Sequence, residues 1–452
     1  MRHRTRRIPV ALLAWMLFSG PAAAATRHVA PGGSDAGNDC LASPCASLNH
    51  TIIIASAGDT ISIAPGVYLE LVPIFLSKSL TIVGSGPQHT HLTVHGTVVK
   101  PIITVLGSNT KAHIQDLELR GGHVLTLEKG GALSNHGKLS IQNVRISNNT
   151  VISEGGGIHN FGEMWVYDSI IEGNEAGHGG GGISNAGSMI IYNSYILGNV
   201  VVGTGQFGDP WDGGGGGILN SGQLHVARSA ILENWSVLSG GGIRTRGTGK
   251  LSVINTTIAE NHAGELGGGV HATGNALLRH VTVAYNTIGE SSPFGGGGIV
   301  AQSLATVDVR NSIVAWNAPQ ECEKIFAVIT GVGNITLDGS CVPIQLNTIG
   351  SDPLLGPLGY HGGTTPSYSL LDGSPAIDAA NAMHCLPGDQ RGFARPIDGD
   401  GLGGAQCDAG SFERQADEEA LEKKGRQQIW RRNGPYYLIP ARPSRVDRGS
   451  RQ

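Results

Sequence analysis

Seven glycine-rich segments, each followed by an aliphatic residue and then by an asparagine, recur through the middle of this chain. The asparagine follows the aliphatic residue by 16 or 18 positions, and successive units begin 25 to 35 residues apart. A repeat of this length predicts a stack of similar structural units, each forming one coil. The aliphatic residues are Leu133, Ile158, Ile183, Ile218, Ile243, Val270 and Ile299, and the asparagines are Asn149, Asn174, Asn199, Asn234, Asn261, Asn286 and Asn317.

Short runs between the glycines alternate apolar and polar residues, as in residues 139–141, 224–226 and 251–253. This alternation predicts β-strands, and glycine suits the tight corners between them. We therefore predict an all-β fold, a parallel β-helix (solenoid) of roughly ten coils with a small irregular C-terminal cap. One asparagine at a fixed place in each coil predicts a ladder of side chains about 4.8 Å apart, which hydrogen-bond to one another or to the turn backbone.

The chain divides into four predicted parts. Residues 1–25 combine a basic head, an apolar stretch over 8–18 and a run of small residues, which is typical of a secretory signal peptide. The apolar stretch is too short to span a bilayer. We expect the β-helix with an N-terminal cap over 26–341, a disulfide-pinned cap domain over 342–413 and a basic, disordered tail over 414–452. The expected location is secreted, or associated with the outer membrane or cell surface.

Six cysteines lie outside the repeats. Six thiols allow fifteen connectivities, which the sequence leaves open, and the simplest pairing joins near neighbours. That pairing is Cys40–Cys45, Cys322–Cys341 and Cys385–Cys407. No C-x-x-C or Cys/His grouping indicates zinc.

Charge narrows the range of partners. When the four arginines of 1–25 and the ten basic and five acidic residues of 414–452 are set aside, 17 basic and 30 acidic residues remain, a net charge of −13. An acidic body argues against a nucleic-acid partner. The segment Asp398-Gly399-Asp400-Gly401 lacks the full spacing of a calcium loop, so we interpret it as a turn. We expect no metal or cofactor and no transmembrane span, and the sequence leaves calcium and the oligomeric state open.

Three sets of residues resemble known exported bacterial proteins. The glycine-rich and aliphatic-x-x-Asn pairs resemble the repeats of chlamydial-type polymorphic outer-membrane proteins, although those repeats more often carry Phe where this chain has Ile or Val. Residues 33–68, with Cys40 and Cys45, resemble the start of right-handed β-helix proteins of the pectate-lyase-like fold, and residues 352–413 resemble the choice-of-anchor Q domain. The resemblance implies a right-handed parallel β-helix and export. It implies no single activity, because this fold hosts lyases, hydrolases, epimerases, tailspikes and adhesins.

The two longest insertions between repeats fall in the same turn of the coil. Because insertions in repeat proteins collect on one face, we predict a ligand-binding edge there. Carboxylates, imidazoles and aromatic rings together are typical of sites that stack on sugars and hydrogen-bond to them, and a solvated row of turns is the alternative. The predicted ligand-binding residues are Glu175, His178, Asp209, Trp211, Asp212, Trp235, His262 and Glu265.

Two pairs of residues in neighbouring coils are alternative catalytic candidates. Glu233 and Glu260 share one column about 5 Å apart, a spacing that suits paired-carboxylate hydrolysis as well as an ordinary solvated surface. Arg244 and His271 share another, where a lyase would place its proton abstractor, but no acidic cluster stands beside them. A row of rings on a strand face has two interpretations of its own: the rings stack on a sugar, or they pack against one another along the rod. These rings are Trp165, Tyr167, Tyr192 and Tyr195.

The expected function is a secreted or cell-surface β-helix scaffold for adhesion or glycan binding, without catalysis. Its partner would be a polysaccharide or another cell-surface ligand. The rival hypothesis is a polysaccharide lyase or glycoside hydrolase that acts on acidic glycans, and a third is a purely structural envelope protein. An enzyme needs titratable groups that converge in one groove, whereas the candidates here are spread along an edge.

Overall fold

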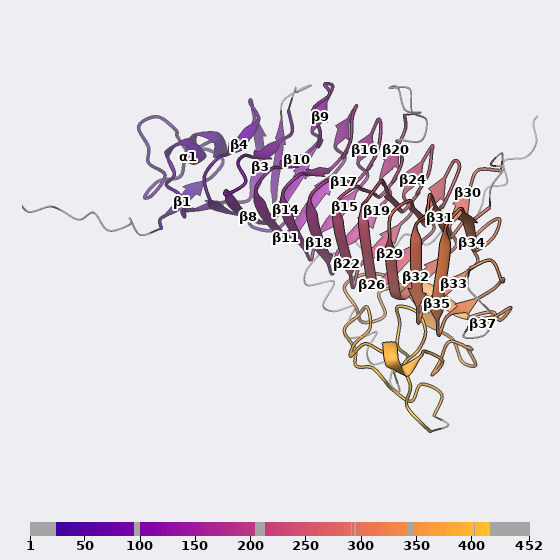
Figure 1. The fold of residues 1–452 in the computed structure, drawn as a ribbon. Helices are drawn as coiled ribbons and strands as arrows, with labels where there is room; N and C mark the ends of the chain where they lie inside the picture. The colour runs from indigo at the N-terminus through magenta and orange to yellow at the C-terminus, as the bar shows by residue number, and fades with distance from the viewer. Residues whose placement is uncertain are drawn as a thin grey trace, which may run out of the picture.

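The structure of this chain is a computed structural model that describes residues 24–94, 100–203, 213–290, 292, 295–341, 347–401 and 403–415. Most of the predicted signal peptide and of the predicted tail lie outside these ranges. The described chain winds into a rod of stacked coils, and the segment after residue 350 folds back beneath the C-terminal half of the rod (Figure 1). Among the described residues, no helix has the length and hydropathy that a membrane span requires.

The coils contribute strands to three parallel sheets, which we call A, B and C. Sheet B contains β4 (Ile74–Leu76), β7 (Ile103–Val105), β10 (Leu133–Asn135), β13 (Ile158–Asn160), β17 (Ile183–Asn185), β21 (Ile218–Asn220), β25 (Ile243–Thr245), β28 (Val270–Ala272), β31 (Ile299–Gln302) and β34 (Cys322–Ile325). Sheet C contains β9 (His123–Val124), β12 (Thr150–Val151), β16 (Glu175–Ala176), β20 (Val200–Val201), β24 (Trp235–Ser236), β27 (His262–Ala263) and β30 (Thr287–Ile288).

Sheet A bends along the rod into two flanks. The first flank contains β1 (Thr26–Val29), β2 (Thr60–Ile63), β5 (Leu80–Val83), β14 (Glu163–Tyr167), β18 (Ser188–Tyr192), β22 (Gln223–Ala227), β32 (Thr306–Arg310) and β35 (Val328–Val332). The second contains β3 (Gly66–Glu70), β6 (Thr90–Val94), β15 (Ile170–Glu172), β19 (Tyr195–Leu197), β23 (Ala230–Leu232), β33 (Ile313–Ala315), β36 (Ile335–Thr336) and β37 (Thr348–Ile349). Four long strands run through both flanks: β8 (Lys111–Arg120), β11 (Lys138–Ser147), β26 (Lys250–Ala259) and β29 (Ala276–Ala284).

Parallel pairing between successive coils confirms the predicted fold class, an all-β parallel β-helix. Strand β13 lies between β10 and β17, with Ile158 opposite Leu133 on one side and Ile183 on the other. The ten strands of sheet B agree with the predicted number of coils. The repeating aliphatic residues are fully buried, so they stack into one continuous core along the rod.

A single residue in the left-handed conformation forms the corner between the two flanks of sheet A. Its φ lies between 45° and 58° in eight successive coils. Asparagine and aspartate tolerate this conformation better than most side chains, which explains why they hold most of these positions. We call these residues the corner column: Asp116, Asn143, Asp168, Asn193, Arg228, Asn255, His280 and Asn311.

The predicted asparagine ladder is confirmed. From Asn149 to Asn317, each Nδ2 donates to Oδ1 of the counterpart one coil further on, at 2.8–3.0 Å. The same oxygen accepts the backbone N–H of the counterpart one coil back. All seven side chains are buried. Each amide therefore depends on the next one for its hydrogen bonds.

A second ladder, which the sequence analysis did not predict, runs along the turn between sheets B and A. Asn135, Asn160, Asn185 and Asn220 are linked from Nδ2 to Oδ1 at 2.7, 2.8 and 2.8 Å. Each follows the repeating aliphatic residue by two positions. Both ladders stabilise corners that carry many backbone polar groups away from water.

Helix α1 (Leu48–Ile54) covers the N-terminal end of the rod. Ser47 caps it by accepting the backbone N–H of His50, and Leu48 and Ile52 pack into the core. The disulfide Cys40–Cys45 closes the loop before the helix. The other two predicted pairings, Cys322–Cys341 and Cys385–Cys407, are confirmed as well.

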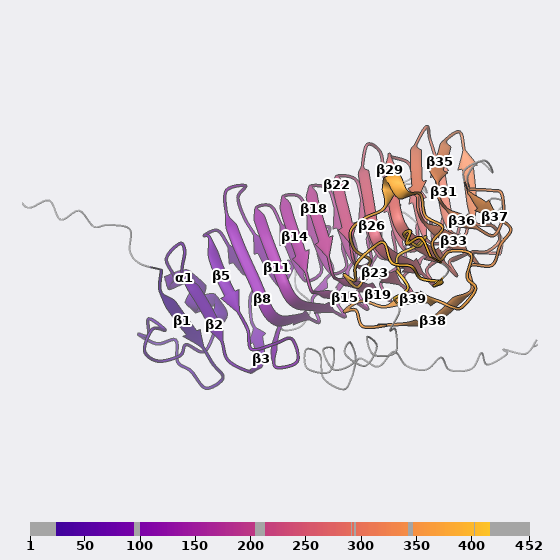
Figure 2. The same ribbon diagram turned by 90° about the horizontal axis from the view of Figure 1, so that it is seen from below.

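The C-terminal module comprises the described residues from 350 to 415. It contains the antiparallel strands β38 (Leu355–Gly359) and β39 (Ser367–Leu370) and the 3-10 helix η2 (Ala382–His384). It lies against the second flank of sheet A in the C-terminal coils (Figure 2). Several outward side chains of that flank are small where the module covers them, and Phe412 is buried beside the larger Ile313. These small residues are Ala230, Thr257, Ala259, Thr282 and Ala284.

Candidate functional site

Sheet C carries part of the predicted ligand-binding edge. Register places Glu175, Val200, Trp235 and His262 in one column of four successive coils. The rings of Trp235 and His262 are stacked, with centroids 6.2 Å apart, and Trp235 is 38% exposed. Burial lowers the pKa of His262. The structure therefore brings Trp235 and His262 together, and it leaves Glu175 two coils away.

Two further residues of the predicted edge, His178 and Glu265, lie in the turn between sheets C and B. The backbone of His178 forms hydrogen bonds to the backbones of Ser153 and Gly214. Burial raises the pKa of Glu265, and the nearby Arg244 guanidinium opposes that shift. Asp209, Trp211 and Asp212 lie outside the described residues. Binding at this edge stays a prediction.

Arg244 and His271 are neighbours in sheet B, as the spacing indicated. Both are buried, with exposed fractions of 4% and 0%. Burial, with the positive charge of Arg244 as the second cause, lowers the pKa of His271 to about 3, and its Nε2 lies 2.8 Å from Oε1 of Gln302. A neutral, buried imidazole is a poor match for a substrate in solution, so the catalytic role of this pair stays a prediction with burial against it.

Glu233 and Glu260 occupy equivalent corners of neighbouring coils, each at the left-handed position just before a ladder asparagine. Glu260 accepts a hydrogen bond from the Tyr368 hydroxyl of the C-terminal module at 3.0 Å. The module therefore uses one of the two carboxylates as a docking contact. Paired-carboxylate catalysis here stays a prediction.

One acidic cluster has the geometry to hold a cation. Carboxylate oxygens of Asp378, Asp398 and Asp400 lie within 4.8 Å of one another. Asp398 also accepts the backbone N–H groups of Gly401 and Gly403. This is the turn chemistry expected from the sequence. The carboxylates thus have a structural role in the loop with or without an ion.

A polar cavity of about 290 Å³ lies between the corner column and the C-terminal module. Its floor comes from four successive coils of sheet A, and one wall comes from the module. We call it the corner cavity. Its principal polar lining residues are Gln115, Asp116, Gln142, Asn143, Arg145, Asp168, Asn193, Tyr195, Tyr360 and Thr364.

Aspartate and asparagine alternate along the floor of the corner cavity, and neighbouring coils are joined in pairs. Asn143 donates from Nδ2 to Oδ1 of Asp116 at 2.6 Å, and Asn193 donates to Oδ1 of Asp168. Gln115 and Gln142 approach the second carboxylate oxygens of Asp116 and Asp168 at 3.1 and 3.4 Å. The amides thereby fix the orientation of both carboxylates, which present acceptors of defined direction to the cavity.

In the later coils, from Arg228 onward, the C-terminal module covers the corner column; we call this contact the seal. Arg228 donates from Nε to the carbonyl oxygen of Gln390 at 3.2 Å, and Asn255 donates from Nδ2 to that of Gly388 at 2.8 Å. Asn311 exchanges two hydrogen bonds with the backbone of Asn381. Where the column is covered, its side chains therefore bind polar groups of the module.

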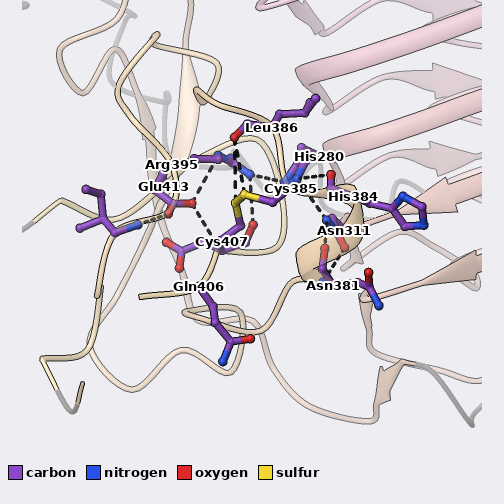
Figure 3. The surroundings of a disulfide bond; sticks show 12 residues. His280, Asn311, Asn381, His384, Cys385, Leu386, Arg395, Gln406, Cys407 and Glu413 are labelled. Carbon is purple, nitrogen blue, oxygen red and sulfur yellow. Dashed lines mark hydrogen bonds and ion pairs between the residues drawn. A yellow bond between two sulfur atoms is a disulfide. The ribbon is translucent and has the colours of Figure 1, made fainter. Parts of the chain in front are cut away.

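The centre of this seal surrounds the Cys385–Cys407 disulfide (Figure 3). His280 Nε2 lies 3.2 Å from the carbonyl oxygen of His384, and Nδ1 of His280 meets the guanidinium of Arg395. Burial, and then the charge of Arg395, holds the pKa of His280 well below its ordinary value. The imidazole is therefore neutral and can accept from Arg395.

Two further groups set the electrostatics of the corner cavity. Arg145 is the cation of the lining, and it is paired with Glu172 and lies 3.6 Å from Glu118. Burial raises the pKa of Tyr195, so its phenol stays protonated and is able to donate a hydrogen bond. With Asp116 and Asp168 on the floor, the lining carries more negative than positive charge. An acidic ligand would be repelled there.

The corner cavity was not predicted from the sequence, although Tyr195 was one of the four rings expected on a strand face. A signal was present, because an Asx residue recurs one coil apart at Asp116, Asn143, Asp168 and Asn193. No sequence pattern indicated the wall that covers this floor, because the module residues Tyr360 and Thr364 follow these positions by more than 160 residues.

No protein-family model and no curated protein matches this chain. Solved structures similar to it include pectate lyase Pel9A, with 14% identity, a TM-score of 0.43 and coverage of 86% of this chain and 96% of that one. The A-module of mannuronan C-5 epimerase AlgE6 from Azotobacter vinelandii shares 14% identity over 67% of this chain and 91% of that one, with a TM-score of 0.35. ORF18 of Geobacillus virus E2 shares 10% identity over 70% and 57%, with a TM-score of 0.31. At these values the class of the chain, a parallel β-helix protein, is defined by its own sheet topology.

Proposed function

We propose that this protein is an exported β-helix scaffold that binds a neutral glycan in the corner cavity. One observation carries the proposal: the four corner residues that precede Arg228 all line the cavity. In the covered coils, corner asparagines such as Asn255 bind polar groups of the module. The carboxylates and amides that line the cavity offer donors and acceptors of the same kind to the hydroxyl groups of a sugar.

The three disulfides support export, because disulfides persist in oxidising compartments outside the cytosol. The charge of the cavity supports a neutral ligand. The single guanidinium of Arg145 is already engaged by Glu172, whereas Asp116 and Asp168 face the cavity. A polyuronate would bring further carboxylates to this surface, and like charges in contact disfavour binding.

Binding without turnover fits the fixed carboxylates better than catalysis does. Both aspartates accept hydrogen bonds from neighbouring amides, which suits recognition of hydroxyl groups. The rival functions, polysaccharide lyase and glycoside hydrolase, require a group that exchanges protons with substrate. The phenol of Tyr195, whose pKa is raised by burial, is a donor and a poor base.

Calorimetry with neutral and acidic polysaccharides tests the proposal on the purified mature chain. Asp168→Gly removes one acceptor and keeps the corner, since Gly333 has a similar conformation at the corner of a later coil (φ 69°). We expect affinity for the neutral ligand to fall roughly tenfold, which corresponds to about 1.4 kcal/mol. Trp235→Ala, on the sheet C edge, is the matched control and should leave binding unchanged.

Two results would contradict the proposal. Loss of binding in Trp235→Ala with normal binding in Asp168→Gly would move the site to the edge predicted from the sequence. Sustained release of reducing ends or of unsaturated uronate from any polysaccharide would make the protein an enzyme. Both readouts use the same panel of ligands.

A further inference from the structure

The corner cavity ends at the module. Thr364 donates from Oγ1 to Oδ1 of Asn193, and Thr365 donates to the carbonyl oxygen of Arg228 at 3.2 Å. The next corner residue, Arg228, turns its guanidinium to the Tyr192 hydroxyl at 2.7 Å and to the carbonyl of Gln390. A ligand that follows the column toward the C-terminal coils therefore meets a wall after Asn193.

This wall is held from both sides. The Arg228 guanidinium lies over the Tyr192 ring, 5.4 Å from its centroid. On the module side, a Cβ added to Gly392 would lie 2.1 Å from Nη2 of Arg228, so the backbone there packs directly on the guanidinium. A guanidinium fixed by the ring and hydroxyl of Tyr192 and by one backbone segment of the module does not move aside for a passing chain.

The opposite end of the cavity is marked by the loop that precedes β6. Pro87 of this loop lines the cavity, and the neighbouring Gly86 donates its N–H to the carbonyl oxygen of Asp116 at 2.8 Å. The floor therefore extends over the four coils from Asp116 to Asn193. Coils in a parallel sheet are spaced by about 4.8 Å. An extended chain of pyranose rings advances by a similar length for each sugar residue.

We infer that the corner cavity binds the end of a linear neutral glycan, or a short free oligosaccharide, lying along the rod axis with its terminal residue against Thr364 and Tyr360. This inference rests on the proposed function and adds the part of the glycan that is recognised. The interior of a polymer does not fit, because its chain would have to continue through Arg228. About four sugar residues match the four coils of the floor.

Titration with neutral gluco-, manno- and chito-oligosaccharides of increasing length tests this inference. Affinity should rise up to about the tetrasaccharide and then remain constant. A bulky label on one chain terminus, attached in turn to the reducing and non-reducing ends, should abolish binding in one of the two orientations. With long polymers, the number of bound protein molecules should follow the number of chain ends and should rise when the polymer is cut.

Two variants at opposite ends of the floor sharpen the test. Thr364→Ala removes a hydroxyl at the wall and should weaken every oligosaccharide roughly fivefold, the effect of about one hydrogen bond. Gln115→Ala, at the far end, should weaken the tetrasaccharide by a similar factor and leave the disaccharide unchanged. Equal sensitivity of the disaccharide to both variants would contradict the placement along the axis.

The outcomes separate the inference from the function on which it rests. If labelled and unlabelled chains bind alike and capacity follows polymer mass, the protein binds glycan interiors, so the inference fails and the proposed function stands. If no neutral glycan binds in any form, both fail. Binding that saturates at about four residues and requires one free terminus supports both.

Discussion

The carboxylate of Glu321 accepts both the backbone N–H and the side-chain amide of Asn317, at 3.2 and 2.6 Å. It stands where a further asparagine of the ladder would otherwise present its Oδ1. Burial raises the pKa of Glu321 to about 7, although the hydrogen bonds from Asn317 favour the ionised form. A stack of neutral amides thus ends on a group that titrates near neutral pH.

Because the asparagine ladder ends on Glu321, we predict that the free energy of unfolding depends on pH. The folded-state pKa lies above the ordinary value of 4.5, so the stabilisation by Glu321 is present below pH 4.5 and is lost as the pH rises through 7. The full loss is roughly 3 kcal/mol at 1.36 kcal/mol for each pKa unit. Glu321→Gln keeps an acceptor and cannot ionise. Its unfolding free energy relative to the parent should therefore rise between pH 4.5 and 7. A constant difference over this range would refute the assignment.

Interruption of the ladder should destabilise the rod. Asn261 donates to Oδ1 of Asn286 and to the carbonyl oxygen of Ile231, and its own Oδ1 accepts two hydrogen bonds from Asn234. Asn261→Ala leaves these buried partners unsatisfied, so we expect a loss of about 2 to 4 kcal/mol in the free energy of unfolding. Ser188→Ala, at an exposed strand position, is the control for thermal or urea unfolding. Equal stability of the two variants would show that the ladder contributes little.

Gly392 should be essential for docking of the module. Its φ is +90°, and an added Cβ would lie 2.1 Å from Nη2 of Arg228. Gly392→Ala should therefore loosen the module and expose it to limited proteolysis. Gly401→Ala is the matched control, because Gly401 also has positive φ (72°) but nothing lies within 4 Å of its added Cβ. If both variants are cleaved at the same rate, backbone strain and not the contact with Arg228 is responsible.

The charge of the cavity floor should decide between neutral and acidic ligands. Replacement of Asp116 and Asp168 by asparagine keeps a residue type that the corner already accepts at Asn143 and Asn193. The double variant removes two negative charges, so acidic oligosaccharides should gain affinity roughly tenfold while neutral ones lose a smaller factor. Calorimetry at low and high salt measures both effects. Parent-like rejection of acidic ligands by the double variant would show that the repulsion arises elsewhere.

The sequence was sufficient for the rod because its information is local and periodic. One asparagine and one aliphatic residue at fixed places in each coil predict both the ladder and the core, and the positions from Asn149 to Asn317 agree with the structure. Glu233 and Glu260 were likewise placed correctly in one column from spacing alone. Successive coils are related by translation along the rod, which preserves their register. The spacing of a repeat in the sequence therefore predicts which residues are neighbours in space.

The corner cavity could not be predicted in the same way. Its wall depends on contacts such as Thr257 with Gln390, which are 133 residues apart and belong to no repeat. Small residues such as Ala259 and Ala284 indicate that another layer covers the sheet only when they are already known to point outward. The longest insertions instead indicated a site on another edge, and part of these insertions lies outside the described residues. Spacing placed Arg244 and His271 in one column, but it did not indicate their burial, which follows from the glycine-rich turns that pack over sheet B.

The module docks on the coils from Asn193 onward, and most of the floor of the corner cavity belongs to the coils before Asn193. A whole coil added or removed between Asp116 and Asn193 would change the length of the cavity floor and leave every docking contact of the module intact. Such changes need no new side-chain chemistry, since each coil brings its own ladder asparagine and its own corner residue. Duplication or deletion of a single repeat is therefore a route by which chains of this design could diverge in the length of ligand they accept while keeping one and the same end wall.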